Sequence, residues 1–403
     1  MEYSRFDVVI IGAGVVGLSV GMALLESNPN LKIIVFDKER NLGMHASGRN
    51  SGVLHAGFYY SPNSLKARFC VEGNYELKKF CKEVGIPVKS CGKIVVTKNS
   101  NEDDRLELLF KRGLENGVNL ELLPAKKLDR FEPLAKTFKT FLWSPDSAIA
   151  DASEVIKSMR RRFEERGGLV RTQTKVQITT DENQISVLGD KLTFKHLVNA
   201  AGAQADKIAK QIGLANDYAM LPFLGLYHSI SYNKLPIRTL VYPVPHPINP
   251  FLGVHLTPAI DNFVKIGPTA IPIFGREQYS LLSGWRSLEF SEILKGSWAI
   301  AKGNSHDFSG IVKSEWTKLF RKEIVKLAAE LIPNVENIAG WTRKPPGIRA
   351  QLVHLPSGNL EQDFVIRKFS NSTHILNAVS PGWTSALPFG RYVATEFVLP
   401  ALA

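Results

Sequence analysis

The clearest pattern of apolar and polar positions lies at the N-terminus. An apolar, β-branched run at residues 8–11 leads directly into the glycine spacing Gly12-x-Gly14-x-x-Gly17, and residues 18–25 continue with helical apolar spacing. This order predicts a strand, a tight turn and a helix. Gly12 permits the turn, Gly14 lets the backbone approach a pyrophosphate, and Gly17 lets helix and strand pack closely. The stretch therefore predicts a dinucleotide-binding unit, with an ordinary strand–helix turn as the alternative.

A second apolar run favours the dinucleotide interpretation. Residues 32–36 form a predicted strand that ends at Asp37, where an acidic side chain can take ribose hydroxyls. A polar loop follows from His45 to Tyr60. Several of its small residues suit close backbone passage over a cofactor, namely Ser47, Gly48, Asn50, Ser51 and Gly52.

The rest of the chain alternates helical and strand patterns. Helices are expected at residues 65–83, 103–115, 125–131, 155–166 and 206–212, and a last one opens at residues 380–385 and runs through residue 399. Strands are expected at residues 91–97, 169–174, 176–180, 184–188, 364–367 and 374–379. Another strand ends at Asn199-Ala200-Ala201-Gly202, where small residues allow the backbone to lie beside a dinucleotide.

The middle of the chain, from about residue 216 to 340, changes character. Prolines cluster at residues 243–250, and aromatic strands alternate with two long polar helices, which predicts a separate antiparallel-sheet domain. A chain of 403 residues has room for two domains. We expect an α/β fold, in which a Rossmann-like cofactor domain (1–85, 145–215 and 341–403) interleaves with an α+β substrate domain (86–144 and 216–340).

Composition and charge limit the classes of partner that we expect. The hydrophobic content of 44% and charged content of 22% are those of an ordinary folded protein. The net charge of +12 is spread along the chain and favours a solvated basic surface, which suits acidic substrates or an anionic membrane face. Because no basic motif interleaved with aromatic residues occurs, we expect no nucleic-acid partner.

Cysteines and the N-terminal segment bear on location. Cys70, Cys81 and Cys91 have no metal-ligand spacing and cannot all pair, so we expect no metal site and a reducing compartment. Residues 8–25 carry no charge, but their glycines and the strand that follows argue against a membrane span or a signal peptide. We expect a cytoplasmic protein, with peripheral contact on the inner membrane face left open.

Several strings resemble one group of flavoproteins. The glycine turn, the loop at residues 45–60, the strand end at 198–202, Gly347-Ile348-Arg349 and the Ser-Pro-Gly helix start resemble the D-amino-acid oxidase and glycine oxidase type. Within that group the sequence is most similar to L-2-hydroxyglutarate dehydrogenases and oxidases. The strings that carry this likeness lie at residues 50–60, 64–67, 91–93, 242–245, 251–257 and 347–351, so the resemblance covers nearly the whole chain.

The resemblance implies FAD as the cofactor, rather than NAD, and a D-amino-acid oxidase-like fold. It also implies oxidation of a small L-2-hydroxy acid, with L-2-hydroxyglutarate to 2-oxoglutarate as the first candidate. The residues expected to bind the cofactor are Gly12, Gly14, Val15, Val16, Gly17, Asp37, Lys38, Ser47, Gly48, Asn50, Ser51, Gly52, Val176, Ala201, Gly202, Arg349, Pro381, Gly382, Trp383, Thr384 and Ser385.

The chain departs from the family pattern at a few positions. Leu224 stands where an arginine is expected after Pro222-Phe223, and Leu226 replaces an acidic residue of the same string. If the missing arginine binds a distal carboxylate, the substrate is a different 2-hydroxy acid. Further departures occur at Thr269, Val379 and Gly382-Trp383.

The chemistry of hydroxy-acid oxidation requires a carboxylate clamp, a base for the hydroxyl proton and a close approach of C2 to the flavin. Arg349 is the expected clamp, since a guanidinium holds a carboxylate bidentately. The candidate bases are His55 and His255, because the pKa of histidine lies near working pH; structural histidines are the alternative reading. His45, His196 and His374 are expected to be structural.

Residues Tyr59, Tyr60 and Lys66 are expected to line the substrate pocket. At the last helix, the amides near Gly382, Thr384 and Ser385 are expected to face the flavin pyrimidine edge and stabilise its reduced anion.

The electrons are expected to pass to a quinone-type acceptor or to O2. Alternative functions are an amino-acid or amine oxidase or a glycerol 3-phosphate dehydrogenase on the same scaffold, a flavin-containing RNA-modifying protein or basic adaptor, and a purely structural role.

Overall fold

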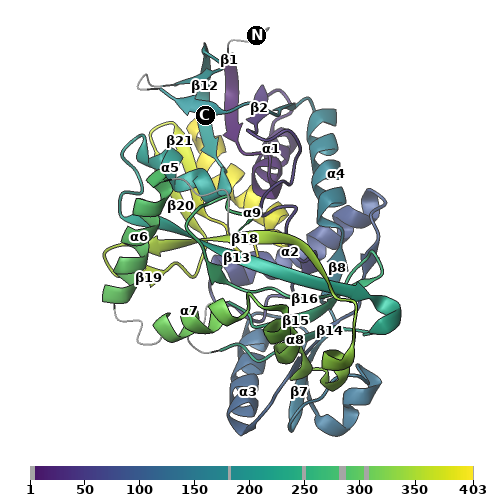
Figure 1. Ribbon diagram of the computed structural model, residues 1–403. Coiled ribbons are helices and arrows are strands. Elements are labelled where there is room, and N and C mark those ends of the chain that lie inside the picture. The colour runs from purple at the N-terminus through teal and green to yellow at the C-terminus, as the bar shows by residue number, and fades with distance from the viewer. Residues whose placement is uncertain (1–4, 180–182, 247–250, 281–286, 304–307, 403) are drawn as a thin grey trace.

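The computed structural model describes residues 5–179, 183–246, 251–280, 287–303 and 308–402. Two large sheets dominate it, one in the upper half and one in the lower half of Figure 1, and the long strands β13 (Tyr218–Ser231) and β18 (Thr342–His354) of the lower sheet cross the middle of the view. A small third sheet joins β3 (Val53–Leu54), β8 (Ala148–Ala150) and β4 (Val88–Lys89).

The upper sheet is eight-stranded and has a parallel centre. Its strands, in the order in which they pair, are β10 (Val176–Ile178), β11 (Gln184–Val187), β12 (Asp190–Asn199), β1 (Arg5–Ile11), β2 (Ile33–Phe36) and β9 (Leu169–Arg171), with β21 (Ser372–Asn377) beside β12 and β20 (Val365–Phe369) beside β21. Parallel pairing links β9, β2, β1, β12 and β21. This is the doubly wound arrangement that the glycine turn predicts.

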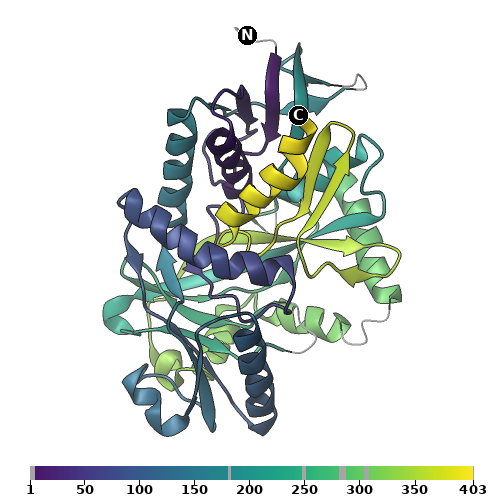
Figure 2. The ribbon, with the colours of Figure 1, turned by 180° about the vertical axis from the view of Figure 1, so that it is seen from behind.

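Both faces of β1 are buried, which explains its unbroken apolar run. Val8 and Ile10 pack into a core with α1 (Val15–Ser27), α4 (Ala152–Glu165) and α9 (Ala386–Val393), whereas Val9 and Ile11 pack into a second core on the other face. The view from behind shows the terminal helix running past α1 and β21 (Figure 2). N- and C-terminal elements therefore build one side of the sheet together.

The lower sheet is ten-stranded and mostly antiparallel. The order of pairing is β19 (Asn359–Leu360), β18, β13, β16 (Phe263–Gly267), β15 (His255–Pro258), β14 (Leu240–Pro243), β5 (Lys93–Val96), β7 (Thr140–Ser144) and β6 (Glu121–Pro124), with β17 (Ile271–Pro272) beside β13. Within this sheet β14 and β5 pair in parallel. Arg349, His255 and Lys93 are thus carried by three different strands of one sheet.

The remaining helices flank these sheets. They are α2 (Leu65–Glu83), α3 (Ser100–Glu115), the 3-10 turns η1 (Ala125–Arg130), η2 (Gly202–Gln204), η3 (Tyr232–Lys234) and η4 (Pro333–Asn337), α5 (Ala205–Lys210), α6 (Ser287–Lys302), α7 (Phe308–Thr317), α8 (Arg321–Ala329), the π-helical turn η5 (Ala394–Val398) and α10 (Leu399–Leu402). The predicted bounds of α2 agree with the structure, because Ser64 caps its first turn by accepting from the Ala67 amide.

Strand β18 contains two consecutive prolines. The consecutive prolines Pro345 and Pro346 argue against a strand, since they offer no N–H to a ladder. In the structure they lie where the pairing of β13 with β18 shifts register, between Gly225 and Tyr227, so their missing donors are accommodated. β18 joins the ten-stranded sheet although we assigned residues 341–403 to the cofactor domain; the domain boundaries remain a prediction.

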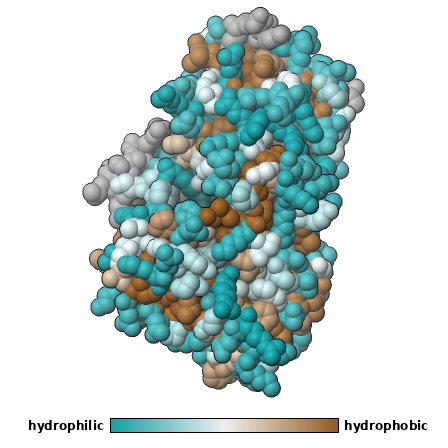
Figure 3. Space-filling view, turned by 90° about the vertical axis from the view of Figure 1, so that its right-hand side faces the viewer, coloured by the Kyte–Doolittle hydropathy of each residue, from teal (hydrophilic) through white to brown (hydrophobic). Residues whose placement is uncertain are grey.

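The surface mixes polar and apolar side chains. Figure 3 shows the side at the right of Figure 1, where hydrophilic residues cover most of the face and hydrophobic ones gather in patches. Among the described residues, no helix is both long enough and apolar enough to cross a membrane.

Candidate active site

One cavity of about 560 Å³ lies between the two large sheets. The glycine turn, the end of β2 and the turn after β12 line one end, and β13, β14, β15 and β18 line the other. The loop at residues 43–55 and the turn at residues 378–384 line it in between. Segments from the whole length of the chain therefore meet in a single elongated site.

At the first end, the backbone leaves no room for side chains. Gly12 has a φ of +106°, and a Cβ added there would lie 2.5 Å from the carbonyl oxygen of Ala200. A Cβ on Gly14 would lie 2.8 Å from Ser47 Oγ, which also accepts a hydrogen bond of 3.1 Å from the Val15 amide. The first turn of α1 holds no acidic residue. This end fits an anionic pyrophosphate, because the glycines let a ligand approach the backbone closely and the dipole of α1 favours negative charge there.

Asp37 closes this end of the cavity. Its carboxylate accepts hydrogen bonds of 2.9 Å from the amides of Ala13 and Glu39, which tie the glycine turn to the end of β2. Each carboxylate oxygen has a further lone pair for a ligand hydroxyl. Contact with the ribose remains a prediction.

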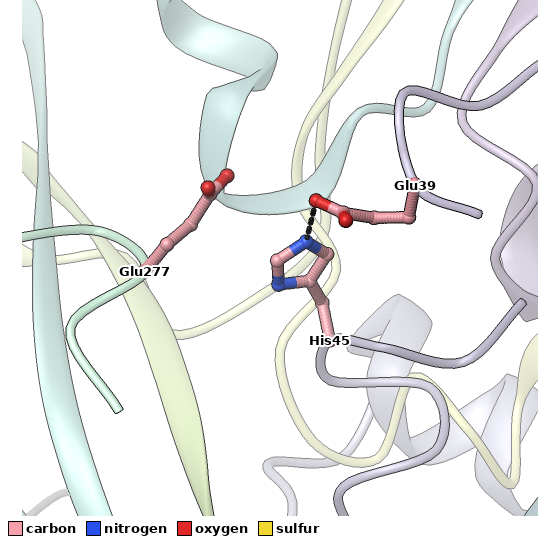
Figure 4. A group of neighbouring side chains, drawn as sticks. All are labelled: Glu39, His45 and Glu277. Carbon is pink, nitrogen blue, oxygen red and sulfur yellow. Dashed lines mark hydrogen bonds and ion pairs between the residues drawn. The ribbon is translucent and has the colours of Figure 1, made fainter. Parts of the chain in front are cut away.

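A polar cluster of Lys38, Glu39, His45 and Glu277 forms part of the wall. Figure 4 shows three of its members, Glu39, His45 and Glu277. His45 Nε2 lies 3.0 Å from Glu39 Oε1, and the Lys38 ammonium pairs with Glu39 and lies 2.9 Å from Glu277 Oε1. Hydrogen bonding to Lys38 holds the pKa of Glu39 below its ordinary value. The Lys38 ammonium already supplies a positive charge next to the carboxylates of Glu39 and Glu277. We therefore interpret this cluster as a structural link between the end of β2 and the turn before α6, rather than as a metal site.

His45, which we expected to be structural, belongs to this polar cluster and also contacts a tyrosine. Its Nδ1 lies 2.7 Å from the hydroxyl of Tyr279, whose ring carries the Arg49 guanidinium 4.2 Å from its centroid. Arg276, which precedes Glu277 in the chain, is fully buried and forms ion pairs with Asp206 and Glu292. No local sequence pattern indicates these partners, because they meet only in the folded chain.

The turn before α9 connects the C-terminal segment to the loop at residues 45–60. Thr384 Oγ1 accepts from the His55 amide and donates to the Val53 carbonyl, both at 3.2 Å. Trp383 Nε1 is buried without a partner among the described residues, which suits an additional ligand. The amides of Gly382 and Ser385 donate to Val379 and Pro381 carbonyls, however, so the expected use of these two amides toward a flavin is not supported.

The second end of the cavity holds three basic side chains. Arg349 on β18 has a buried Nη1 with no hydrogen-bond partner among the described residues, and its guanidinium carbon lies 5.3 Å from the Phe251 ring centroid. His55 and His255 also line this end. Burial, followed by the charges of Lys93, His255 and Arg349, lowers the pKa of His55 well below its ordinary value.

His255 is held in one tautomer. Its Nδ1 lies 2.8 Å from the Gly253 carbonyl, which only accepts, so Nδ1 carries the proton and Nε2 is an acceptor. The ring stacks on Tyr242 with centroids 3.8 Å apart. Burial lowers the pKa of His255 to about 3, so the ring is neutral near pH 7.

Most of the residues expected to bind the cofactor line the cavity. They are Gly12, Gly14, Val15, Val16, Asp37, Lys38, Ser47, Asn50, Ser51, Val176, Ala201, Gly202, Arg349, Pro381, Gly382, Trp383 and Thr384. Four do not line it: Gly17, Gly48, Gly52 and Ser385. Gly17 instead packs α1 on β1, since an added Cβ would lie 2.0 Å from the Gly12 carbonyl oxygen.

Of the four residues expected to bind substrate, Arg349 lines the cavity, whereas Tyr59, Tyr60 and Lys66 lie outside the lining. Tyr59 packs on Phe58, with ring centroids 4.2 Å apart, and Tyr60 is near Ser380. Lys66 is buried at the start of α2, where its amide donates to Asp363. A direct contact of these three with substrate remains untested.

Leu224 and Leu226 do not face the cavity either. Leu224 is fully buried, pairs with Ile348 across β13 and β18, and packs in the core of the ten-stranded sheet with Leu226. The departures from the family pattern at these two positions therefore lie beneath the cavity floor and not in its lining.

Comparison with known protein families identifies the family to which this chain belongs. The model of the family described as FAD dependent oxidoreductase matches residues 7–396. The chain belongs to this family. Its cofactor is FAD, and the bare glycine turn, Asp37 and the unpartnered Trp383 fit that group in the residues of this chain.

Relatives and solved structures extend the family assignment. The L-2-hydroxyglutarate dehydrogenase of Escherichia coli O17:K52:H18 is 35% identical over 97% of this chain and 93% of the relative, and the human mitochondrial enzyme of the same name is 34% identical over 98% and 89%. The fold resembles L-alpha-glycerophosphate oxidase from Mycoplasma pneumoniae (TM-score 0.75, 22% identity, 97% and 94% coverage) and glycine oxidase from Geobacillus kaustophilus (TM-score 0.69, 18% identity, 97% and 94%). This oxidoreductase thus has the expected fold.

Proposed function

We propose that this oxidoreductase oxidises the 2-hydroxyl of a small L-2-hydroxy acid, with L-2-hydroxyglutarate to 2-oxoglutarate as the first candidate reaction. The observation that carries the proposal is Arg349, whose Nη1 has no partner in the described part of the chain, beside two neutral histidines at the end of the cavity. Such a group recognises a carboxylate and leaves a base for the adjacent hydroxyl. The names of the relatives supply the specific acid.

Arg349 has the role of carboxylate clamp. A guanidinium offers two parallel N–H donors, and the Phe251 ring beside it supports the guanidinium group. With the carboxylate fixed, C2 and its hydroxyl have a defined position relative to the histidines. FAD, when bound, supplies the acceptor for the hydride equivalent from C2.

His55 has the role of base. Thr384 holds its amide, Asn74 and Cys70 donate to its carbonyl, and its Nδ1 faces Lys93, so Nε2 on the opposite edge of the ring is left for the substrate. His255 has its Nε2 fixed as an acceptor and can align the hydroxyl. Replacing His55 with alanine should slow flavin reduction by about 10² to 10⁴, and His255→Ala should cost less. The reverse order would assign the base to His255.

Anaerobic bleaching of the flavin tests the substrate class. The panel compares L- and D-2-hydroxyglutarate, L-malate, L-lactate, glycine, L-proline and glycerol 3-phosphate. We expect the fastest bleaching with L-2-hydroxyglutarate. Bleaching by an amino acid or by glycerol 3-phosphate alone would overturn the proposal in favour of a sister oxidoreductase, and faster bleaching by a shorter hydroxy acid would replace L-2-hydroxyglutarate as the candidate substrate.

We further propose that the electrons pass to a quinone-type acceptor at an anionic membrane surface, with O2 as the alternative. The support is the outer face of α6 (Figure 1). It exposes Phe290, Leu294 and Trp298 at helical spacing, and its exposed charged residues within the described range are Lys295 and Lys302. Aromatic and basic side chains on one helix face match the interface of an anionic bilayer.

The cavity lies close to this helix. Arg276, which lines the cavity, pairs with Glu292 on the inner side of α6, and its amide donates to Glu289. A membrane docked on the outer side of α6 would therefore bring a dissolved quinone near the site.

Co-sedimentation with vesicles tests the membrane contact. We expect binding to vesicles of phosphatidylglycerol and phosphatidylcholine but not to phosphatidylcholine alone, and loss of binding in a Phe290→Ser, Leu294→Ser, Trp298→Ser variant. Leu108→Ser, at an exposed leucine of α3, is the matched control. Unchanged binding of the triple variant would refute this surface. Rates with a soluble quinone analogue and with O2 identify the acceptor.

A further inference from the structure

Lys93 is a fully buried lysine that no motif argument assigned. It begins β5, and its Nζ lies 3.3 Å from Nδ1 of His55 and 4.2 Å from the ring centroid of Tyr242. The Tyr59 and Phe58 rings lie 5.2 and 5.5 Å away. Among the described residues, no carboxylate forms an ion pair with it. Lys93 lies behind the cavity wall, so it reaches the reaction only through His55.

A buried amine without a carboxylate partner favours its neutral form. Burial lowers the pKa of Lys93 to about 7. The thiols of Cys70 and Cys91 act weakly in the opposite direction, but burial raises their own pKa values, so they remain neutral. The other titratable groups that face this region are His55, Tyr59, Tyr242, His255 and Arg349, and none of them supplies a negative charge near pH 7.

We propose that Lys93 is the proton acceptor behind His55, receiving the Nδ1 proton as His55 takes the substrate hydroxyl proton at Nε2. The inference rests on the proposed role of His55 as base. The substrate O–H bond breaks and an Nε2–H bond forms; the Nδ1–H bond breaks and a third N–H bond forms on Lys93, which becomes an ammonium. Only protons move in this step, and the imidazole ends neutral.

The surroundings of Lys93 fit both of its charge states. The neutral amine accepts from Nδ1–H of His55, which leaves Nε2 free as a base. The ammonium formed afterwards faces the rings of Tyr242 and Tyr59, where a cation–π contact stabilises it without a permanent anion. His255 has no equivalent acceptor, because its Nδ1 proton is held by a backbone carbonyl. The contact with Lys93 thus distinguishes His55 from His255 as the candidate base.

Lys93 acts through another residue and is a positioning residue, so its test needs a pH profile. In the wild-type enzyme, flavin reduction should be slow at low pH, rise with a midpoint near pH 7 and then level off, since only the neutral amine accepts. Lys93→Met should lower the rate by ~10² and abolish this midpoint. Lys93→Arg keeps a cation at every pH and should be slow throughout. A Lys93→Met enzyme with the wild-type midpoint and rate would overturn the proposal.

The charge state of Lys93 is measurable without turnover. In holoenzyme labelled with ¹⁵N-lysine, the Nζ signal that disappears in Lys93→Met should titrate near pH 7, and His55→Ala should raise that midpoint by removing the Nδ1–H donor. A signal that stays protonated to pH 9, or that ignores His55→Ala, would refute the pairing. If no hydroxy acid bleaches the flavin, the proposed function fails, whereas this titration still decides the state of Lys93.

Discussion

Replacing Arg349 with methionine is the most direct test of the site. The side chain retains its volume but loses both donors of the proposed clamp. In the protein, Nη1 is buried and has no partner among the described residues, so methionine leaves no buried carboxylate unpaired. The contact with the Phe251 ring tolerates an apolar side chain. We therefore expect a folded enzyme whose defect is confined to ligand binding.

The size of the defect follows from the number of donors lost. A hydrogen bond to a charged group contributes about 1.5–3 kcal/mol, so two of them contribute about 3–5 kcal/mol after partial compensation by water. At 1.36 kcal/mol per factor of ten, kcat/KM should fall by about 10² to 5 × 10³. Arg349→Lys retains the charge without the planar fork and should lose about tenfold.

Anaerobic stopped-flow reduction over a range of substrate concentrations measures this loss. Arg343→Met, at an exposed arginine of the same strand, is the control and should behave as wild type. Because Arg349 is also a predicted cofactor residue, the FAD content of each variant must be determined from its absorbance. A KM within about threefold of wild type, with FAD retained, would refute the clamp; loss of FAD would instead assign Arg349 to the cofactor.

Two further predictions concern stability and cofactor binding. Arg276→Met leaves the buried Asp206 carboxylate with Lys210, at 3.2 Å, in place of its two cationic partners, and should lower the free energy of unfolding by ~3 kcal/mol in urea denaturation. The Arg276 pairing, opposing burial, lowers the pKa of Asp206 below 3.8, so its contribution is present above that pH and is lost as the pH falls; an equal effect of Arg276→Met at strongly acid pH would contradict this. Gly12→Ala should abolish FAD binding, since its Cβ would lie 2.5 Å from the Ala200 oxygen. Gly189→Ala, with a similar φ of +92° and open space around it, should retain FAD.

The local sequence was sufficient to predict the helices and strands that are specified by their own apolar spacing and turns. The apolar run and glycine turn predict β1 and α1, and the helical spacing of apolar residues predicts the bounds of α2. The resemblance correctly indicated FAD and the family, because the family strings extend over nearly the whole chain. It also singled out Arg349, His55 and His255, which the fold brings to one end of a single cavity, although their roles remain proposals.

Only the tertiary structure decided which side chains face one another. The place of β18 beside β13 depends on a register shift that no local pattern encodes. Leu224 was expected to alter the pocket, yet the alternation of side chains along β13 turns it into the core. Lys93 lies in a family string, but its burial against His55 requires a strand and a loop that are distant in sequence. Sequence spacing specifies periodicity and turns, whereas burial and proton partners depend on contacts between remote segments.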